Sequence, residues 1–400
     1  MVGPAPFNEP LREPSAWIER LTLTRFRSYT HATLDAGPGP VVLFGANGAG
    51  KTNLLEAVSM LSPGQGLRGA TFADMARQGG AGDWAVHARI VRQGLVHVIG
   101  TGPRPSRSAA GLAAPGARTG RIVRVDGETE AGSGVLADLL EIAWLTPALD
   151  GLLTGPAAER RRYIDRLILC FDPHHRTRAG HFERAMRQRN RLLEDGSRDA
   201  VLFAGLEEIM AEAGVAIAAA RCDAVKALNA VWQRRHARAP TSPFPWATAA
   251  LEGTLEAELS AGRPAVDVED DYVRALASHR ERDRAAGRAL TGPHRSDFHL
   301  THGPKDTPGR FCSTGEQKAL LIGLILAHAE LSAARRDGAP ILLLDEIAAH
   351  LDAARRAALF DELVLLGTQA WLTGTDRAAF SGLENRAAFL HVEDGRITHF

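Results

Sequence analysis

An eight-residue glycine-rich segment constrains this chain more than any other feature of its sequence. It matches the pattern G-x-x-x-x-G-K-[ST] and consists of Gly45, Ala46, Asn47, Gly48, Ala49, Gly50, Lys51 and Thr52. The apolar run at residues 41–44 predicts a buried strand before it, and residues 53–58 predict a helix after it. Glycines let backbone N–H groups turn toward an anion, and a helix N-terminus adds partial positive charge. The segment therefore predicts a site for the phosphates of a nucleoside triphosphate, with Lys51 on the β- and γ-phosphates and the Thr52 hydroxyl on Mg²⁺.

The overall charge gives no sign of a nucleic-acid partner. The 400 residues contain 47 Lys+Arg and 47 Asp+Glu, so a basic surface must be local or be built by oligomerisation. The three cysteines, Cys170, Cys222 and Cys312, are far apart, which favours a reducing compartment over disulfides or a zinc site. No apolar run approaches the roughly 20 residues of a membrane span. The Pro-rich start lacks the features of a signal peptide, so we expect a short flexible tail and a cytoplasmic protein without a membrane partner.

The sequence pattern changes from strand-like to helical and back again along the chain, which predicts a domain that is split in sequence. Residues 18–24, 84–90, 95–100 and 122–125 read as strands, and residues 101–120 are rich in Gly, Pro, Ala and Ser and read as a surface loop. From residue 156 to 290 helical spacing dominates. Buried parallel strands are expected at 341–344 and 371–373, and a terminal hairpin at 389–398. We predict an α/β fold with a tail at 1–16, a nucleotide domain at 17–155 and 291–400, and an inserted, mainly helical domain at 156–290.

A second segment adds acids to the nucleotide site. Asp345 and Glu346 end the apolar run at 341–344. Asp345 is placed to hold Mg²⁺, and Glu346 to act as general base on an attacking water. A solvated acidic pair is the alternative for so short a motif, and the phosphate segment favours the catalytic interpretation.

A third segment, residues 313–318, opens a helix with Ser-Thr-Gly-Glu-Gln-Lys. Ser313 with Glu316 fits a capping box, and the helix start also fits an anion site; both interpretations hold together. The segment resembles the signature motif of ABC-type ATPases, which implies that Ser313 and Gly315 contact, in trans, the nucleotide bound by a second copy. His350-Leu351-Asp352 resembles the D-loop of that superfamily. Whether Gln65 and Asp376 act as switches that respond to the bound nucleotide is left open by the sequence.

The chain resembles the RecF family over nearly its full length. Lys51 and Asp345 are 345 − 51 = 294 positions apart, far more than in transporter ATPases. The most specific matches are residues 155–165 (G-P-x-x-x-R-R-x-x-x-D), 187–193 (R-Q-R-N-R-L-L) and 292–297 (G-P-H-R-S-D), with residues 23–29 as a further match. The family usually has two Asp where this chain has Asp345 and Glu346.

The resemblance implies an ABC-type ATPase head and a role in DNA replication, DNA repair and the SOS response. It implies ATP and Mg²⁺ as cofactors, an ATP-dependent homodimer, and weak DNA-stimulated hydrolysis that acts as a switch. The expected partners are single-stranded or gapped duplex DNA and recombination-mediator proteins, with help in loading a recombinase. Arg27 is expected beside the nucleotide. A transporter ATPase subunit and an SMC-like structural clamp are the alternatives.

The sequence offers two groups of arginines as candidates for DNA contacts. Arg184, Arg187 and Arg191 share one helical face and can lie along phosphates, or can form a solvated face; both interpretations stand. For the stripe of Arg280, Arg284 and Arg288 we expect intrahelical ion pairs. Surface or loop positions are expected for three nearby histidines, His174, His175 and His181.

Overall fold

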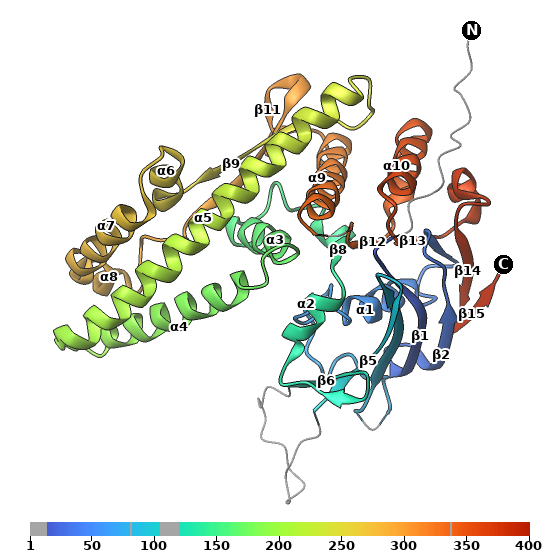
Figure 1. Cartoon of the computed structure of the whole chain (residues 1–400), viewed down its shortest axis with the longest axis horizontal. Coiled ribbons are helices and arrows are strands. Elements are labelled where there is room, and N and C mark those ends of the chain that lie inside the picture. Colours follow the sequence, from blue (N-terminus) through green and yellow to red (C-terminus); the bar gives the residue numbers. More distant parts are fainter. Residues whose placement is uncertain (1–13, 81, 105–119, 337) are drawn as a thin grey trace, which may run out of the picture. The chain divides into compact units, whose positions relative to one another are not determined.

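The structure is a computed structural model that describes residues 14–80, 82–104, 120–336 and 338–400, without the side chains of residues 349 and 350. The chain forms two compact units (Figure 1). Residues 1–148 and 332–400 form one, here called the head unit, and residues 149–331 form the other, here called the helical unit. The helical unit thus begins at residue 149 and ends at residue 331. The inserted domain predicted from the sequence, at residues 156–290, lies within this range, and its limits stay a prediction.

The central sheet of the head unit is six-stranded, with the order β15-β14-β3-β13-β12-β8. Its strands are β3 (Val41–Phe44), β8 (Ile142–Leu145), β12 (Ile341–Leu344), β13 (Ala370–Gly374), β14 (Ala388–Glu393) and β15 (Arg396–His399). All pairings are parallel except the hairpin β14–β15. The predicted parallel strands and terminal hairpin are therefore confirmed.

The second sheet of the head unit is antiparallel, with the order β2-β1-β4-β5-β6-β7. Its strands are β1 (Ala16–Phe26), β2 (Tyr29–Asp35), β4 (Ala85–Arg92), β5 (Leu95–Pro103), β6 (Arg121–Val125) and β7 (Glu128–Thr129). In β1 the apolar residues Ile18, Leu21 and Leu23 are buried, as the alternating pattern predicts. Residues 1–13 of the expected tail lie outside the described residues, and β1 already includes Ala16. The expected loop at 101–120 falls mostly on residues 105–119, which are also outside the described residues.

Helix α1 (Lys51–Ser59) positions the glycine-rich segment between the two sheets, where it contacts β1 of one and β13 of the other. Its residues 54–59 are all buried, so the helix is fixed by packing along most of its length. The head unit also contains α2 (Leu136–Leu139) and α10 (Ala353–Leu366).

The helical unit is built around the long helix α5 (Ala200–Arg238). Figure 1 shows α4 (His175–Glu194) lying beside it, and α6 (Thr254–Ser260) and α7 (Ala265–Ser278) also pack on it. The other helices are α3 (Ala157–Leu169), α8 (Arg280–Ala286) and α9 (Thr314–Arg335), of which α9 runs from residue 314 into residues assigned to the head unit. The predicted helical content at 156–290 is confirmed. A three-stranded sheet of β9 (Ala247–Glu252), β10 (Asp297–His302) and β11 (Thr307–Pro308) was not predicted.

Among the described residues, α9 has the length and apolar composition that a membrane-spanning helix needs. No apolar run of that length was expected from the sequence. Of its most apolar window, 78% is buried inside the protein. Such burial is typical of a core helix.

Candidate nucleotide-binding site

Three segments distant in sequence meet at the carboxyl edge of the central sheet. The strands β3, β13 and β12 are neighbours and run parallel. The glycine-rich loop follows β3, the pair Asp345-Glu346 follows β12, and β13 ends at Gly374. Ligands of open parallel sheets bind at this edge, because the connecting loops leave a crevice there.

The glycine-rich loop has a backbone that only glycine adopts easily. Gly45, Gly48 and Gly50 have φ values of 150°, 82° and 113°. A Cβ atom at Gly45 would lie 2.1 Å from the carbonyl oxygen of Val392, and one at Gly50 would lie 2.7 Å from the Tyr29 hydroxyl. The three glycines therefore shape a loop whose exposed residues 46–48 offer backbone N–H groups to an anion.

Lys51 is only 5% exposed and lies across this loop. Its Nζ donates hydrogen bonds of 2.7 Å to the carbonyl oxygens of Gly45 and Ala46. Burial lowers the pKa of the Lys51 ammonium, and the negative charges of Glu346 and Asp345 oppose that shift. The ammonium is thus positioned inside the phosphate loop by the loop itself.

A chain of hydrogen bonds joins the loop to the acidic strand. The Thr52 hydroxyl donates to the Asp345 carboxylate at 3.0 and 3.1 Å. The Thr373 hydroxyl donates to Asp345 at 2.7 Å and accepts a hydrogen bond of 2.8 Å from the backbone N–H of Glu346. Glu346 has φ 52°, a left-handed conformation that is uncommon outside glycine. Thr373 therefore fixes both acids relative to Thr52.

This donor set fits Mg²⁺ and a nucleoside triphosphate. The Thr52 hydroxyl and the Asp345 carboxylate bring oxygen ligands together, as Mg²⁺ requires, and the loop supplies N–H donors and one ammonium for phosphates. The sequence predicted Thr52, Asp345, Lys51 and Glu346 in this place. It missed the role of Thr373, although a threonine at the end of a buried strand beside the acidic one is a usable signal.

This chain is similar to known proteins over nearly its whole length. The model of the "RecF/RecN/SMC N terminal domain" family matches residues 17–398. The chain is 53% identical over 380 residues to the "DNA replication and repair protein RecF" of Mesorhizobium japonicum, covering 95% of this chain and 97% of that protein. It is 50% identical to the protein of the same name from Brucella suis, covering 95% and 96%. This chain belongs to the RecF family.

Solved structures show the same fold. A structure described as "the recombination mediator protein RecF-ATP in RecFOR pathway" matches with a TM-score of 0.83 at 19% identity, covering 97% of this chain and 98% of that one. The Smc head domain of Pyrococcus furiosus matches with a TM-score of 0.53 at 16% identity, covering 96% of both chains. The predicted fold class of this RecF-family chain, an α/β ABC-type ATPase head with a mainly helical insertion, is confirmed.

The turn at residues 25–29, which carries a RecF-family match, supports the phosphate loop. The Tyr29 hydroxyl donates to the Gly50 carbonyl at 3.0 Å, and Ser28 Oγ accepts from Asn53 at 2.9 Å. The Arg27 guanidinium donates hydrogen bonds of 2.8 and 2.7 Å to the two carboxylate oxygens of the fully buried Glu56. The expected contact of Arg27 with nucleotide stays a prediction, and its observed partner is helix α1. The sequence assigned no role to Tyr29 or Glu56.

The signature segment of this RecF-family chain lies at the start of α9 in the helical unit. Ser313 and Gly315 are exposed, and no atom lies within 4 Å of a Cβ built on Gly315. The Glu316 carboxylate accepts a hydrogen bond of 2.9 Å from the Ser313 backbone N–H, as the predicted capping box requires. An ion pair with Lys305 lowers the pKa of Glu316 to about 2. The helix start is therefore held by local contacts and is exposed to solvent.

Roles as nucleotide switches stay open for Gln65 and Asp376, and the D-loop resemblance of residues 350–352 stays a prediction. Asp376 caps a 3₁₀ helix (Arg377–Leu383) by accepting from the Ala378 N–H at 2.9 Å. Asp352 caps α10 through the Arg355 N–H at 2.9 Å. Gln65 is exposed. The His350 side chain lies outside the described residues.

The arginines of α4 divide into exposed and buried groups. Arg184, Arg187 and Arg191 are exposed, and the last two form long i,i+4 ion pairs of 3.7 and 3.9 Å. Their DNA contact stays a prediction. Arg189 on the same helix is fully buried and donates hydrogen bonds to Glu207 and Asp283 at 2.9 and 2.8 Å.

Two further expectations about charged side chains are now settled. His175 is 1% exposed, lies in α4 and is 2.9 Å from Asp165, so its predicted surface or loop position is wrong because it is a hydrogen-bonded core residue of a helix. Arg284 pairs with Glu281 on its own helix, as expected, but Arg280 pairs with Glu207 of another helix.

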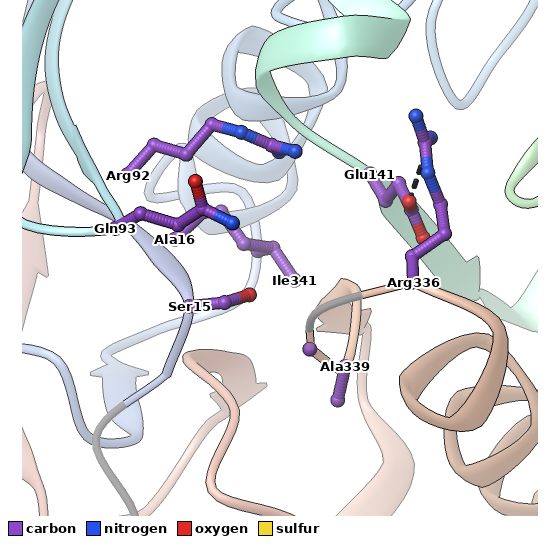
Figure 2. A pocket seen from close by; sticks show the side chains of 9 residues that line it. Ser15, Ala16, Arg92, Gln93, Glu141, Arg336, Ala339 and Ile341 are labelled. Atoms are coloured by element: carbon purple, nitrogen blue, oxygen red, sulfur yellow. Dashed lines mark ion pairs between the residues drawn. The ribbon is translucent and has the colours of Figure 1, made fainter.

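A small cavity of about 20 Å³ lies in the head unit near the start of β8 (Figure 2). Glu141 and Arg336 form an ion pair of 2.7 Å at its wall, with Arg92 and Ser15 nearby. Glu141 Oε2 is buried and has no hydrogen-bond partner among the described residues. Burial raises the pKa of Glu141 to about 7, against the effect of Arg336. The cavity has room for one water molecule and is too small for a nucleotide.

Proposed function

We propose that this chain is an ATP-dependent DNA-binding protein of replication and repair, acting in the cytoplasm. The observation that carries the proposal is the hydrogen-bonded series Thr52, Asp345, Thr373 and Glu346 beside the phosphate loop. Membership of the RecF family supports it, since the relatives bear the name DNA replication and repair protein and one related structure is described with ATP.

Each residue of the site has a distinct task in this proposal. The N–H groups of residues 46–48 and the Lys51 ammonium bind and orient the phosphates. Thr52 and Asp345 would hold Mg²⁺, which would supply positive charge to neutralise the phosphates. A carboxylate oxygen of Glu346 takes the proton of the attacking water, and Thr373 holds the backbone of Glu346 in place for it.

The exposed signature segment supports an ATP-dependent homodimer. Ser313 and Gly315 are free to contact the nucleotide of a second copy, because the surface around Gly315 is open. We propose that the dimer clamps single-stranded or gapped duplex DNA, with Arg184, Arg187 and Arg191 on phosphates, and that weak DNA-stimulated hydrolysis releases it. Recombination-mediator proteins would then use this state to help load a recombinase.

The test is binding of gapped duplex DNA by the Glu346→Gln protein with ATP, with ADP and without nucleotide. We expect a dimer-sized complex with DNA only with ATP, because hydrolysis no longer ends the bound state. The matched control is Lys51→Ala, which should bind neither ATP nor DNA tightly. DNA binding that does not depend on nucleotide, or no binding in any state, would refute the proposal.

A further inference from the structure

Two of the segments that match the RecF family meet inside the helical unit. Arg160 on α3 forms two hydrogen bonds with Asp297, of 2.7 and 2.8 Å. Its neighbour Arg161 donates to the Ser296 carbonyl at 2.6 Å. Residues 155–165 and 292–297 therefore build one structure, although they are more than a hundred positions apart. The nucleotide site described above uses neither segment.

The carboxylates of this structure already have cationic partners. Asp297 is held by Arg160. Asp165 accepts from Arg221 at 2.9 and 2.8 Å and lies 2.9 Å from His175. Arg221 also lies 3.5 Å from the buried Glu256. Asp165 and Asp297 therefore hold other cations through direct hydrogen bonds and act on Arg161 only through their charge.

Arg161 and Arg295 have no carboxylate partner in the described part of the chain. Arg161 is partly buried and makes one hydrogen bond, to Ser296. Burial, then the charges of Arg221 and Arg295, lower the pKa of Arg161, while Asp297 and Asp165 oppose this shift. Arg295 is exposed, and its side chain makes no hydrogen bond or ion pair within the described residues. A guanidinium that loses water without gaining an anion is destabilising, which applies to the partly buried Arg161, and Arg295 adds a second positive charge near it.

We propose that Arg161 and Arg295 form a phosphate site of the helical unit, which takes a phosphodiester group of nucleic acid. The planar guanidinium matches phosphate oxygens in a two-pronged geometry, and Arg161 is held by the Ser296 carbonyl so that little order is lost on binding. The inference rests on the DNA-binding function proposed above and adds a contact point distinct from the α4 arginines. The phosphate of a nucleotide held by a second copy has the same chemistry, and the experiment separates the two sources.

The experiment measures the affinity of Arg161→Gln and Arg295→Gln proteins for gapped duplex DNA in ATP, in the Glu346→Gln background, over a range of salt concentrations. Arg234→Gln is the matched control, because Arg234 is exposed and lies 234 − 221 = 13 residues along α5 from Arg221, about 20 Å at the rise of an α-helix. We expect each test variant to bind DNA about tenfold more weakly. The slope of log affinity against log salt should fall by about 0.9 for each lost phosphate contact. ATP affinity and ATP-dependent dimerisation are measured on the same proteins and should not change.

Equal DNA affinity in the parent and both test variants would overturn the phosphate site while leaving the proposed function intact. Loss of ATP affinity or of dimerisation in the test variants would assign the phosphate to a nucleotide and overturn the nucleic-acid source. A parent protein that binds no DNA in any state would refute the proposed function and this site together. If Arg161→Gln does not fold, the DNA affinity of Arg295→Gln alone tests the phosphate site. This variant is expected to fold, because the Arg295 side chain is exposed and makes no hydrogen bond or ion pair within the described residues.

Discussion

Replacing Thr373 with valine keeps the shape of the side chain and removes the hydroxyl that joins Asp345 to Glu346. Thr373 is fully buried, and its hydroxyl makes hydrogen bonds of 2.7 and 2.8 Å. A hydrogen bond to a charged acceptor contributes about 1.5–3 kcal/mol, and a buried N–H left without an acceptor costs about 1–3 kcal/mol. Glu346 is half-buried, so water replaces part of the second bond. We expect the local stability of the β12–β13 edge to fall by about 2–4 kcal/mol.

The assay is hydrogen exchange of peptides from β12 and β13, because a chain of two compact units need not unfold in one step. The expected loss corresponds to exchange that is about 30- to 1,000-fold faster. ATP hydrolysis should fall about tenfold or more while ATP affinity changes little, since Glu346 is no longer held for proton transfer. The control is Thr33→Val, whose exposed hydroxyl lies 3.3 Å from that of Thr22. Exchange and hydrolysis at the parent rates in Thr373→Val would refute the positioning role.

Three further predictions concern the loop, the partner and the cavity. Tyr29→Phe removes the donor to the Gly50 carbonyl and should weaken ATP binding by about 1 kcal/mol, or about fivefold, in a fluorescent-nucleotide titration; unchanged affinity would contradict the support role. Ser313→Arg should leave ATP binding intact and abolish ATP-dependent dimerisation in light scattering, and a normal dimer would exclude the contact in trans. Because burial raises the pKa of Glu141 to about 7, its protonated form favours folding below the unfolded pKa of about 4.5, and this contribution is lost as pH rises through 7. Between pH 4.5 and 8, urea unfolding should show the parent losing about 3 kcal/mol relative to Glu141→Gln, and parallel pH profiles would contradict it.

The nucleotide site was largely predictable because its signals are local. Lys51 and Thr52 lie in one short segment with a strand before it and a helix after it, and Asp345 directly follows an apolar strand. Parallel strands place their carboxyl ends at one edge, so the two segments were expected to meet there. The role of Thr373 was not predicted because it depends on β13 lying between β3 and β12. The order of strands in a sheet cannot be inferred from any single segment of the sequence.

The charged residues of the helical unit were harder to predict. Arg189 and its exposed neighbours on α4 look alike in sequence, and only the packing of α5 and α8 on α4 separates them. Glu207 and Asp283, which hold Arg189, come from those two helices. Helical spacing therefore identifies a face, but a buried ion pair depends on which other helix covers that face.

The position of β3 between β13 and β14 also determines when the candidate nucleotide site can first form. Synthesis completes β3 at Phe44, and β13 begins only at Ala370, which is 370 − 44 = 326 residues later. At about 5–20 residues per second, the ribosome needs roughly 15–65 seconds to add them. During that time the apolar strand β3 has neither of its neighbours, and the phosphate loop has no Asp345. A nascent or truncated chain that lacks β12, β13 and β14 therefore has no complete phosphate site and exposes an unpaired strand edge, so ATP is expected to stabilise only chains that include these strands.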